Sequence, residues 1–187
     1  MTDAPAREGE LPLETDRLRL RPWRASDAAM HHKLWTERDP RVPPHRRIDA
    51  HGHPTVADLE DWAGRRDDTP PVGLLVAERK DTGEAIGYCG LIPNVHGQHD
   101  EPEIAFELLR RAWGQGYATE ASWAIIRRAE ASGCRRLWAT VRDWNTASRR
   151  VLAKLGFVET GRVEPDEAHG DSLFVAKTLR PSVPPSP

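Results

Sequence analysis

Cysteine is scarce in this sequence, with only Cys89 and Cys134 among 187 residues. Their separation matches no metal-binding or redox motif, so we expect two reduced thiols and no disulfide. No stretch is long and apolar enough to cross a bilayer, and residues 1–12 lack the apolar region of a signal peptide. We therefore expect a cytoplasmic protein with no membrane partner.

An excess of positive charge is also absent. Lys and Arg number 27 against 29 Asp and Glu, so the formal net charge is -2 and a general nucleic-acid binder is not expected. Hydrophobic residues make up 38% of the chain and charged residues 30%, which is typical of one globular domain at this length. We expect that domain to span residues 11–180, between flexible tails at 1–10 and 181–187.

A convincing metal site is missing as well, although the chain has eight histidines. His51 and His53 have one residue between them, but no third ligand accompanies them at a suitable spacing. We therefore predict no metal.

The sequence does contain a regular succession of strands and helices. Leu18 and Leu20 alternate with charged residues and should point inward from a first strand, and Ser26 resembles the N-cap of a first helix. The order of elements predicts a mixed sheet with helices on both faces, an α/β (α+β) fold. The predicted strands are 17–22, 72–79, 84–93, 103–109, 137–141, 157–163 and 173–179, and the predicted helices are 27–38, 56–66, 117–132 and 146–155.

The turn between the strand at 103–109 and the helix at 117–132 contains Gly114 and Gly116. Such a pair lets backbone N–H groups converge on one point, which the positive end of the following helix also faces, so an anion is expected there. The segment 108–156 also carries ten Lys or Arg against three Asp or Glu. A glycine-containing connection without a ligand is the alternative, because a lone Gly-x-Gly is a weak signal.

Two separated motifs carry a resemblance to a known family. They are Arg111-x-x-Gly114-x-Gly116-Tyr-Ala-Thr-Glu120-Ala and Asn145-x-x-Ser148-x-x-x-Leu152-x-Lys154-Leu-Gly156-Phe157. Together they resemble the acetyl-CoA-binding core of the GNAT N-acetyltransferases, and the opening residues 13–28 resemble the RimJ/RimL-like branch. The resemblance covers roughly residues 11–180. It implies a mixed, mostly antiparallel sheet of about seven strands with a central splay.

The resemblance implies acetyl-CoA as co-substrate and a set of residues that bind it. The turn would hold the diphosphate by its amides, the strand before it would pair with the pantetheine arm, and Trp113 is expected to pack beneath the turn. Asn145 would meet the arm from the far side of the splay, although it also suits a helix N-cap. The expected binding residues are Phe106, Leu108, Arg111, Trp113, Gly114, Gln115, Gly116, Tyr117, Ala118, Thr119, Asn145 and Arg150.

Two residues are candidates for the chemistry. Ser148 matches the position of a serine near the sulfur in RimL-like enzymes and is expected to protonate the leaving thiolate; a surface serine is the alternative. Glu103 is expected to accept the proton of the attacking amine or to orient the amine, although a solvated strand end explains this glutamate almost as well. A backbone N–H within 106–108 would stabilise the negative oxygen formed on attack.

The resemblance implies an N-acetyltransferase acting on a primary amine, either a protein N-terminus or a small molecule, as a monomer or homodimer. One alternative is a CoA-binding regulatory module without turnover. Another is a dinucleotide-dependent oxidoreductase, but its fingerprint requires a third glycine where Thr119 stands.

Overall fold

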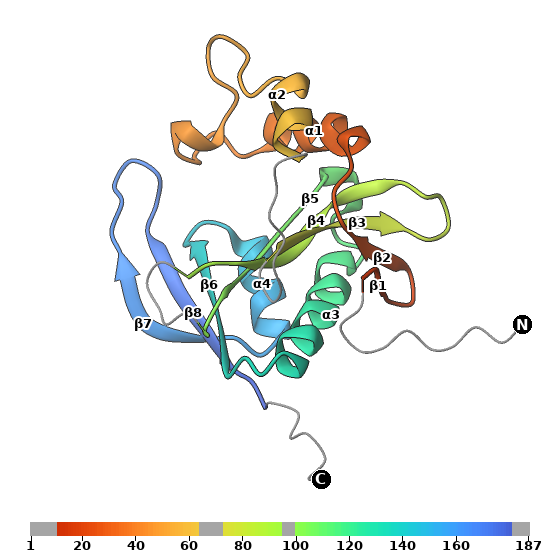
Figure 1. Cartoon of the computed structure of the whole chain (residues 1–187). Helices are drawn as coiled ribbons and strands as arrows, with labels where there is room; N and C mark the ends of the chain where they lie inside the picture. The colour runs from red at the N-terminus through yellow and green to blue at the C-terminus, as the bar shows by residue number, and fades with distance from the viewer. Residues whose placement is uncertain (1–10, 64–72, 95–99, 181–187) are drawn as a thin grey trace, which may run out of the picture.

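The computed structural model describes residues 11–63, 73–94 and 100–180, which form one eight-stranded sheet with helices around it (Figure 1). The strands lie in the order β1-β2-β3-β4-β5-β6-β8-β7, and all neighbours are antiparallel except β5 and β6. The strands are β1 (Leu13–Glu14), β2 (Leu18–Arg21), β3 (Gly73–Arg79), β4 (Ala85–Ile92), β5 (Glu103–Leu108), β6 (Arg136–Arg142), β7 (Val158–Glu164) and β8 (Ser172–Thr178). The helices are α1 (Ala28–Glu37), α2 (Val56–Ala63), α3 (Tyr117–Ala131) and α4 (Thr146–Lys154), with 3₁₀ turns η1 (Ala25–Asp27), η2 (Pro44–Arg46) and η3 (Arg110–Ala112).

The predicted mixed, mostly antiparallel sheet is confirmed, but it has eight strands instead of about seven. The additional strand is β1, which pairs with β2 through Leu13↔Leu20 and Glu14↔Arg19. Two residues are too few to show the alternation by which a strand is recognised in a sequence.

Alternating side chains of the central strands build a core on each face of the sheet. Leu75 of β3 and Cys89 of β4 belong to the larger core, together with Ile125 of α3. Their neighbours Leu74 and Tyr88 point the other way and pack with the α1 side of the molecule. Figure 1 shows α1 and α2 gathered together on one side and α3 and α4 on the other. Helices therefore cover both faces, as predicted.

The parallel strands β5 and β6 meet only at their beginnings. Their register contains the single pair Glu103↔Trp138, beside a hydrogen bond of 3.0 Å from the Trp138 N–H to the Pro102 carbonyl. The next N–H on this edge, that of Thr140, donates to the Glu103 carboxylate at 2.9 Å instead of to the β5 backbone. The two strands part from there toward their carboxyl ends, so the predicted splay is confirmed.

The predicted N-cap of the first helix is wrong, although the helix starts within one residue of the predicted position. Ser26 lies inside η1, and α1 begins only at Ala28 with Asp27 in the N-cap position. The Asp27 carboxylate accepts a hydrogen bond of 2.8 Å from the Arg24 N–H, which tightens the chain into a 3₁₀ turn before the helix.

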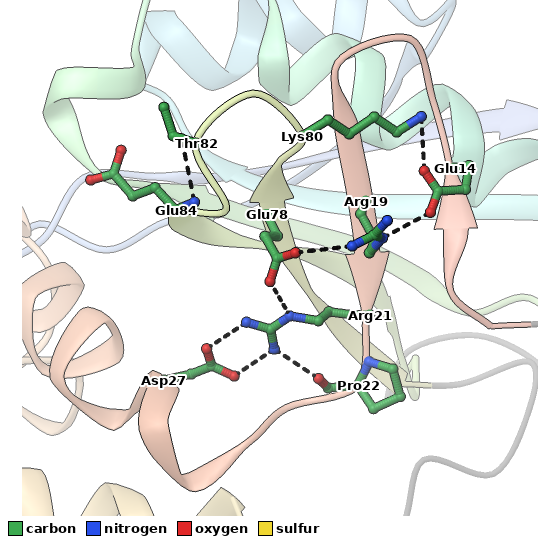
Figure 2. A network of polar contacts seen from close by, with 9 residues as sticks. All are labelled: Glu14, Arg19, Arg21, Pro22, Asp27, Glu78, Lys80, Thr82 and Glu84. Carbon is green, nitrogen blue, oxygen red and sulfur yellow. Dashed lines mark hydrogen bonds and ion pairs between the residues drawn. The ribbon is translucent and has the colours of Figure 1, made fainter.

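A buried ion-pair network holds this turn against the sheet (Figure 2). The guanidinium of Arg21, only 5% exposed, bonds Asp27 at 2.8 Å and Glu78 of β3 at 2.6 Å. The hydrogen bonds to Asp27 raise the pKa of Arg21 above its usual value, although burial acts in the opposite direction. Because removing Arg21 would leave the buried Asp27 carboxylate without its ion-pair partner, the network fixes where α1 leaves the sheet.

Both cysteines are free and buried, in agreement with the expectation of reduced thiols. Burial raises the pKa of Cys89 to about 12, so its thiol stays protonated at neutral pH.

Candidate active site

The edge of β5 that faces the splay offers free backbone groups. The Pro102 carbonyl points toward β6, and since backbone direction alternates along a strand, the N–H and C=O groups of Phe106 and Leu108 point the same way. The register places no β6 partner opposite them. An extended chain with amide groups would fit this edge as an added strand.

The glycine turn adds a cluster of free amides at the end of the same strand. Gly114 and Gly116 have φ of +74° and +83°, a conformation that favours glycine. Gly116 is the N-cap of α3, and since glycine has no side chain, no cap hydrogen bond covers the first N–H groups of the helix. Within the described residues, no acceptor is recorded for the N–H groups of residues 114–119. A Cβ at Gly114 would meet nothing within 4 Å, so the turn is open to a ligand. These features fit the diphosphate of acetyl-CoA.

Arg17 of the β1–β2 connection lies directly against this turn. Its Nη1 donates to the Gln115 carbonyl at 3.0 Å, and its guanidinium covers the ring of Tyr117 at 4.4 Å. Its Nε and Nη2 both bond Glu120 of α3, at 2.7 Å and 2.6 Å. The Glu120 carboxylate also accepts from the Thr15 hydroxyl at 2.6 Å. Burial would raise the pKa of Glu120, but these donors hold it below its usual value.

The side chains of the predicted binding residues Trp113 and Arg111 both have partners within the protein. Trp113 does not pack beneath the turn, because 55% of it is exposed. Its indole N–H donates to the Leu108 carbonyl at 2.6 Å, so of the two Leu108 backbone groups the N–H remains for a ligand, beside the groups of Phe106. Arg111 forms an ion pair with Glu84, and its role toward the cofactor stays a prediction.

The predicted binding residues Gln115, Ala118, Thr119 and Arg150 also have definite places. The first three lie in the turn and the first turn of α3, where their N–H groups are open. Arg150 lines a separate cavity of about 370 Å³ beside Arg149 and Ala153 of α4. Since residues two apart on a helix lie on nearly opposite sides, Arg150 points away from Ser148. Its role toward the cofactor stays a prediction.

Asn145 and Ser148 form the start of α4 at the carboxyl end of β6. The Asn145 side chain accepts a hydrogen bond of 3.1 Å from the Ser148 N–H, so the N-cap role is confirmed. The Asn145 amide nitrogen and the Ser148 hydroxyl make no recorded hydrogen bond with the part of the chain that is described. Both groups are therefore available to a ligand in the splay.

Glu103 stands at the point where β5 and β6 separate. It is half-buried, and its carboxylate accepts the Thr140 N–H. Alternation places Glu103 on the same face as Glu107, the face toward α1. Glu103 is thus a bridge across the beginning of the splay in addition to being a candidate base.

A second carboxylate, Glu107, was not among the predicted residues. Both its oxygens bond Arg38, at 2.7 Å and 2.6 Å, and the Tyr88 hydroxyl donates to it at 2.8 Å. Burial would raise the pKa of Glu107, but the Arg38 guanidinium keeps it lowered, while burial raises that of Tyr88. Glu107 is therefore a poor proton acceptor, and its role is to join α1 to β5.

Sequence patterns gave no sign of Arg38, Glu107 and Tyr88 acting together, because they come from three distant segments. Arg17 and Glu120 both lay within the recognised motifs, but only the fold brings them into contact. Among the described residues, no group of three or more His, Cys, Asp or Glu is arranged to hold a metal ion. None of the described helices is long and apolar enough to span a membrane.

A parallel strand pair that parts beside a glycine turn and an open helix N-terminus is the architecture of a CoA-dependent acyltransferase. A family model described as "Acetyltransferase (GNAT) domain" matches residues 17–158, so the chain belongs to the GNAT acetyltransferase family. The resemblance to its RimJ/RimL-like branch is confirmed, and the chain is a GNAT N-acetyltransferase.

Known proteins agree with this assignment. The chain is 31% identical to the uncharacterized N-acetyltransferase p20 of Bacillus licheniformis over 80% of its own length and 83% of that protein. Two further curated relatives match over 56% and 48% of their lengths, so the chain spans about half of them.

Solved structures share the fold. A GNAT-family acetyltransferase from Bacillus anthracis superposes with a TM-score of 0.73 at 19% identity, over 89% of this chain and 97% of that one. Mycobacterium smegmatis RimJ in complex with CoA-disulfide superposes with a TM-score of 0.64 at 26% identity, over 90% of this chain and 88% of that one. Family membership sets aside the oxidoreductase alternative.

Proposed function

We propose that the protein transfers an acetyl group from acetyl-CoA to a primary amine, by direct attack within a ternary complex. The observation that carries this proposal is the single pair Glu103↔Trp138 between β5 and β6, followed by a turn of open amides at residues 114–119. The parted strands suit the pantetheine arm, and the amides suit the diphosphate. M. smegmatis RimJ, which shares the fold, is in complex with CoA-disulfide, and this supports a CoA ligand here.

In this proposal the groups around the splay bind the pantetheine arm, stabilise charge or transfer protons. The N–H groups of Phe106 and Leu108 bind the arm, and one of them stabilises charge on the thioester oxygen. The amine nitrogen bonds to the acyl carbon as the C–S bond breaks. Ser148, directly or through water, gives a proton to the sulfur. Glu103 accepts the proton that the amine loses or orients the amine. Asn145 holds the arm from the α4 side.

The acceptor on this proposal is a protein N-terminus or a small amine. A neutral amine is required for attack, and an α-amino group, whose pKa is about 8, needs less help from Glu103 than a lysine, whose pKa is about 10.4.

The test combines binding and turnover. Calorimetry should detect acetyl-CoA binding, and a thiol-release assay with a panel of amines and peptides should detect free CoA that depends on the amine. Binding without release in any mixture would instead support a regulatory CoA-binding module, and an absence of binding would refute the proposal.

A further inference from the structure

A large cavity lies beside β5 on the face opposite α3. It has a volume of about 610 Å³, within the range of small-molecule sites, and is lined by residues of α1, α2, the connection between them, β3 and β4. Its aromatic and aliphatic side chains include His31, Trp35, Leu59, Trp62, Leu74 and Tyr88, and its polar or charged ones are Arg38, His45, Arg47, Asp49, His53 and Asp58.

The aromatic rings of this wall pack as one cluster. The His31 ring lies 5.0 Å from Trp62 and 6.2 Å from Tyr88 between ring centroids, and the Trp35 indole N–H donates to His31 at 3.2 Å. Trp23 joins the cluster behind them at 4.8 Å from His31. The wall is therefore held in a defined shape before any ligand enters, and it presents flat apolar surface.

The cavity adjoins the strand that would carry the pantetheine arm. Two of its wall residues, Arg38 and Tyr88, are bonded to Glu107 of β5, which stands between Phe106 and Leu108. The connection that forms its outer wall also reaches the start of α4, since the Arg41 guanidinium lies 4.2 Å from the ring of Trp144. An amine in the cavity would thus lie beside the splay.

Most charged groups of the lining have side-chain or backbone partners within the protein, and the Arg47 guanidinium donates to the Pro40 carbonyl at 3.0 Å. The Glu107 carboxylate neutralises the positive charge of the Arg38 guanidinium through an ion pair. Asp58 accepts from Thr55 and pairs with His53 at 2.7 Å, and Asp49 accepts the N–H groups of His51 and His53. The carboxylates of the described wall are thus already hydrogen-bonded, Asp58 with His53 and Asp49 with backbone N–H groups.

We propose, building on the function proposed above, that the acceptor is a primary amine on an aromatic or branched apolar group. That group occupies the cavity against Trp35, Trp62 and Leu74, and the amine points to β5. The site selects by apolar contact, and a polyamine would lose hydration at this wall, where Asp49 and Asp58 already accept hydrogen bonds from the protein.

The test compares kcat/KM for phenethylamine and isoamylamine with that for spermidine and ethanolamine. We expect the first two to be favoured by about tenfold or more, the usual value of good apolar contact in a pocket. Trp62→Ala should lower kcat/KM for phenethylamine by a similar factor and leave the KM for acetyl-CoA unchanged. Trp123→Ala is the matched control, since Trp123 is 37% exposed on α3 and Trp62 is 40% exposed.

A measurement on the unchanged protein covers the case in which Trp62→Ala does not fold. Saturation-transfer NMR in the presence of CoA should show phenethylamine bound and spermidine not displacing it. Preference for spermidine, or equal losses in both tryptophan variants, would overturn the proposal. If acetyl-CoA binds but aromatic amines are not favoured, only the acceptor class is wrong; if acetyl-CoA does not bind, the proposed function itself is wrong.

Discussion

Arg17 and Glu120, 103 residues apart in sequence, form a two-bonded ion pair at the base of the glycine turn. The same guanidinium donates to the Gln115 carbonyl inside the turn. By drawing that carbonyl inward, Arg17 keeps the amides of the turn facing outward, and it places a positive charge beside them. The pair is therefore expected to shape the site of the diphosphate.

Arg17→Ala should raise the KM for acetyl-CoA by about tenfold, with little change in kcat. The reason is the loss of charge-assisted bonds that order the turn, worth about 1.5 kcal/mol at a half-exposed site. Arg17→Lys should recover part of the affinity. Arg19→Ala is the control, because Arg19 lies two residues further along on β2, is similarly exposed and pairs with Glu14 at 2.9 Å, away from the turn. An equal effect of both alanine variants in steady-state kinetics would argue against a positioning role.

The Arg17–Glu120 pair also predicts a dependence on pH. Because the folded protein lowers the pKa of Glu120 below 4.5, the pair contributes stability above that pH and loses it as the pH falls through the folded-state value. The difference in unfolding free energy between the wild type and Glu120→Gln should therefore be constant from pH 6 to 8 and shrink below pH 4.5. Urea denaturation at several pH values measures it, and a difference that grows in acid would contradict the assignment.

Gly116→Ala should weaken acetyl-CoA binding beyond its effect on stability. An alanine is strained at a φ of +83°, by about 1–3 kcal/mol, and its Cβ would lie 3.4 Å from the Arg17 Nη2 that orders the turn. Gly133→Ala carries the same strain, since Gly133 has a φ of +82° at the other end of α3 with nothing within 4 Å of a Cβ. We expect similar melting temperatures for the two variants and a lower affinity, by calorimetry, only in Gly116→Ala. Equal affinities would move the anion site away from this turn.

Ser148→Ala should lower kcat by about tenfold to a hundredfold and leave the affinity for CoA nearly unchanged. A hydroxyl that protonates the sulfur acts mainly in the transition state, and general acid catalysis commonly contributes about a hundredfold. The N-cap bond uses the Ser148 N–H and survives the change, so α4 should remain intact. Ser132→Ala, at the exposed end of α3, serves as the control. An unchanged kcat would leave Ser148 as a structural residue.

Local patterns predicted most of the fold because they record which side of an element is buried. Leu18 and Leu20 alternate with arginines and are fully buried, and α4 ends at Lys154, just before Gly156, whose φ is +82°. The prediction failed where a residue distant in sequence bonds a group that the local pattern assigns to a near neighbour. Ser26 could cap a helix, but Asp27 is held by Arg21 and reshapes the turn.

The candidate site was predictable only in part, for the same reason. The glycine turn and the Asn145 cap are local, so their motifs located them. The pairing of Arg17 with Glu120, the exposure of Trp113 and the aromatic cavity each depend on segments that meet only in the folded chain. No periodicity or spacing in the sequence contains that information.

The most direct test of the account is a crystal structure of the protein with acetyl-CoA. We expect the diphosphate within hydrogen-bonding distance of the N–H groups of residues 114–119 and the pantetheine arm paired with Phe106 and Leu108 between β5 and β6. Acetyl-CoA bound elsewhere on the protein, or β5 and β6 paired along their whole length, would contradict the account.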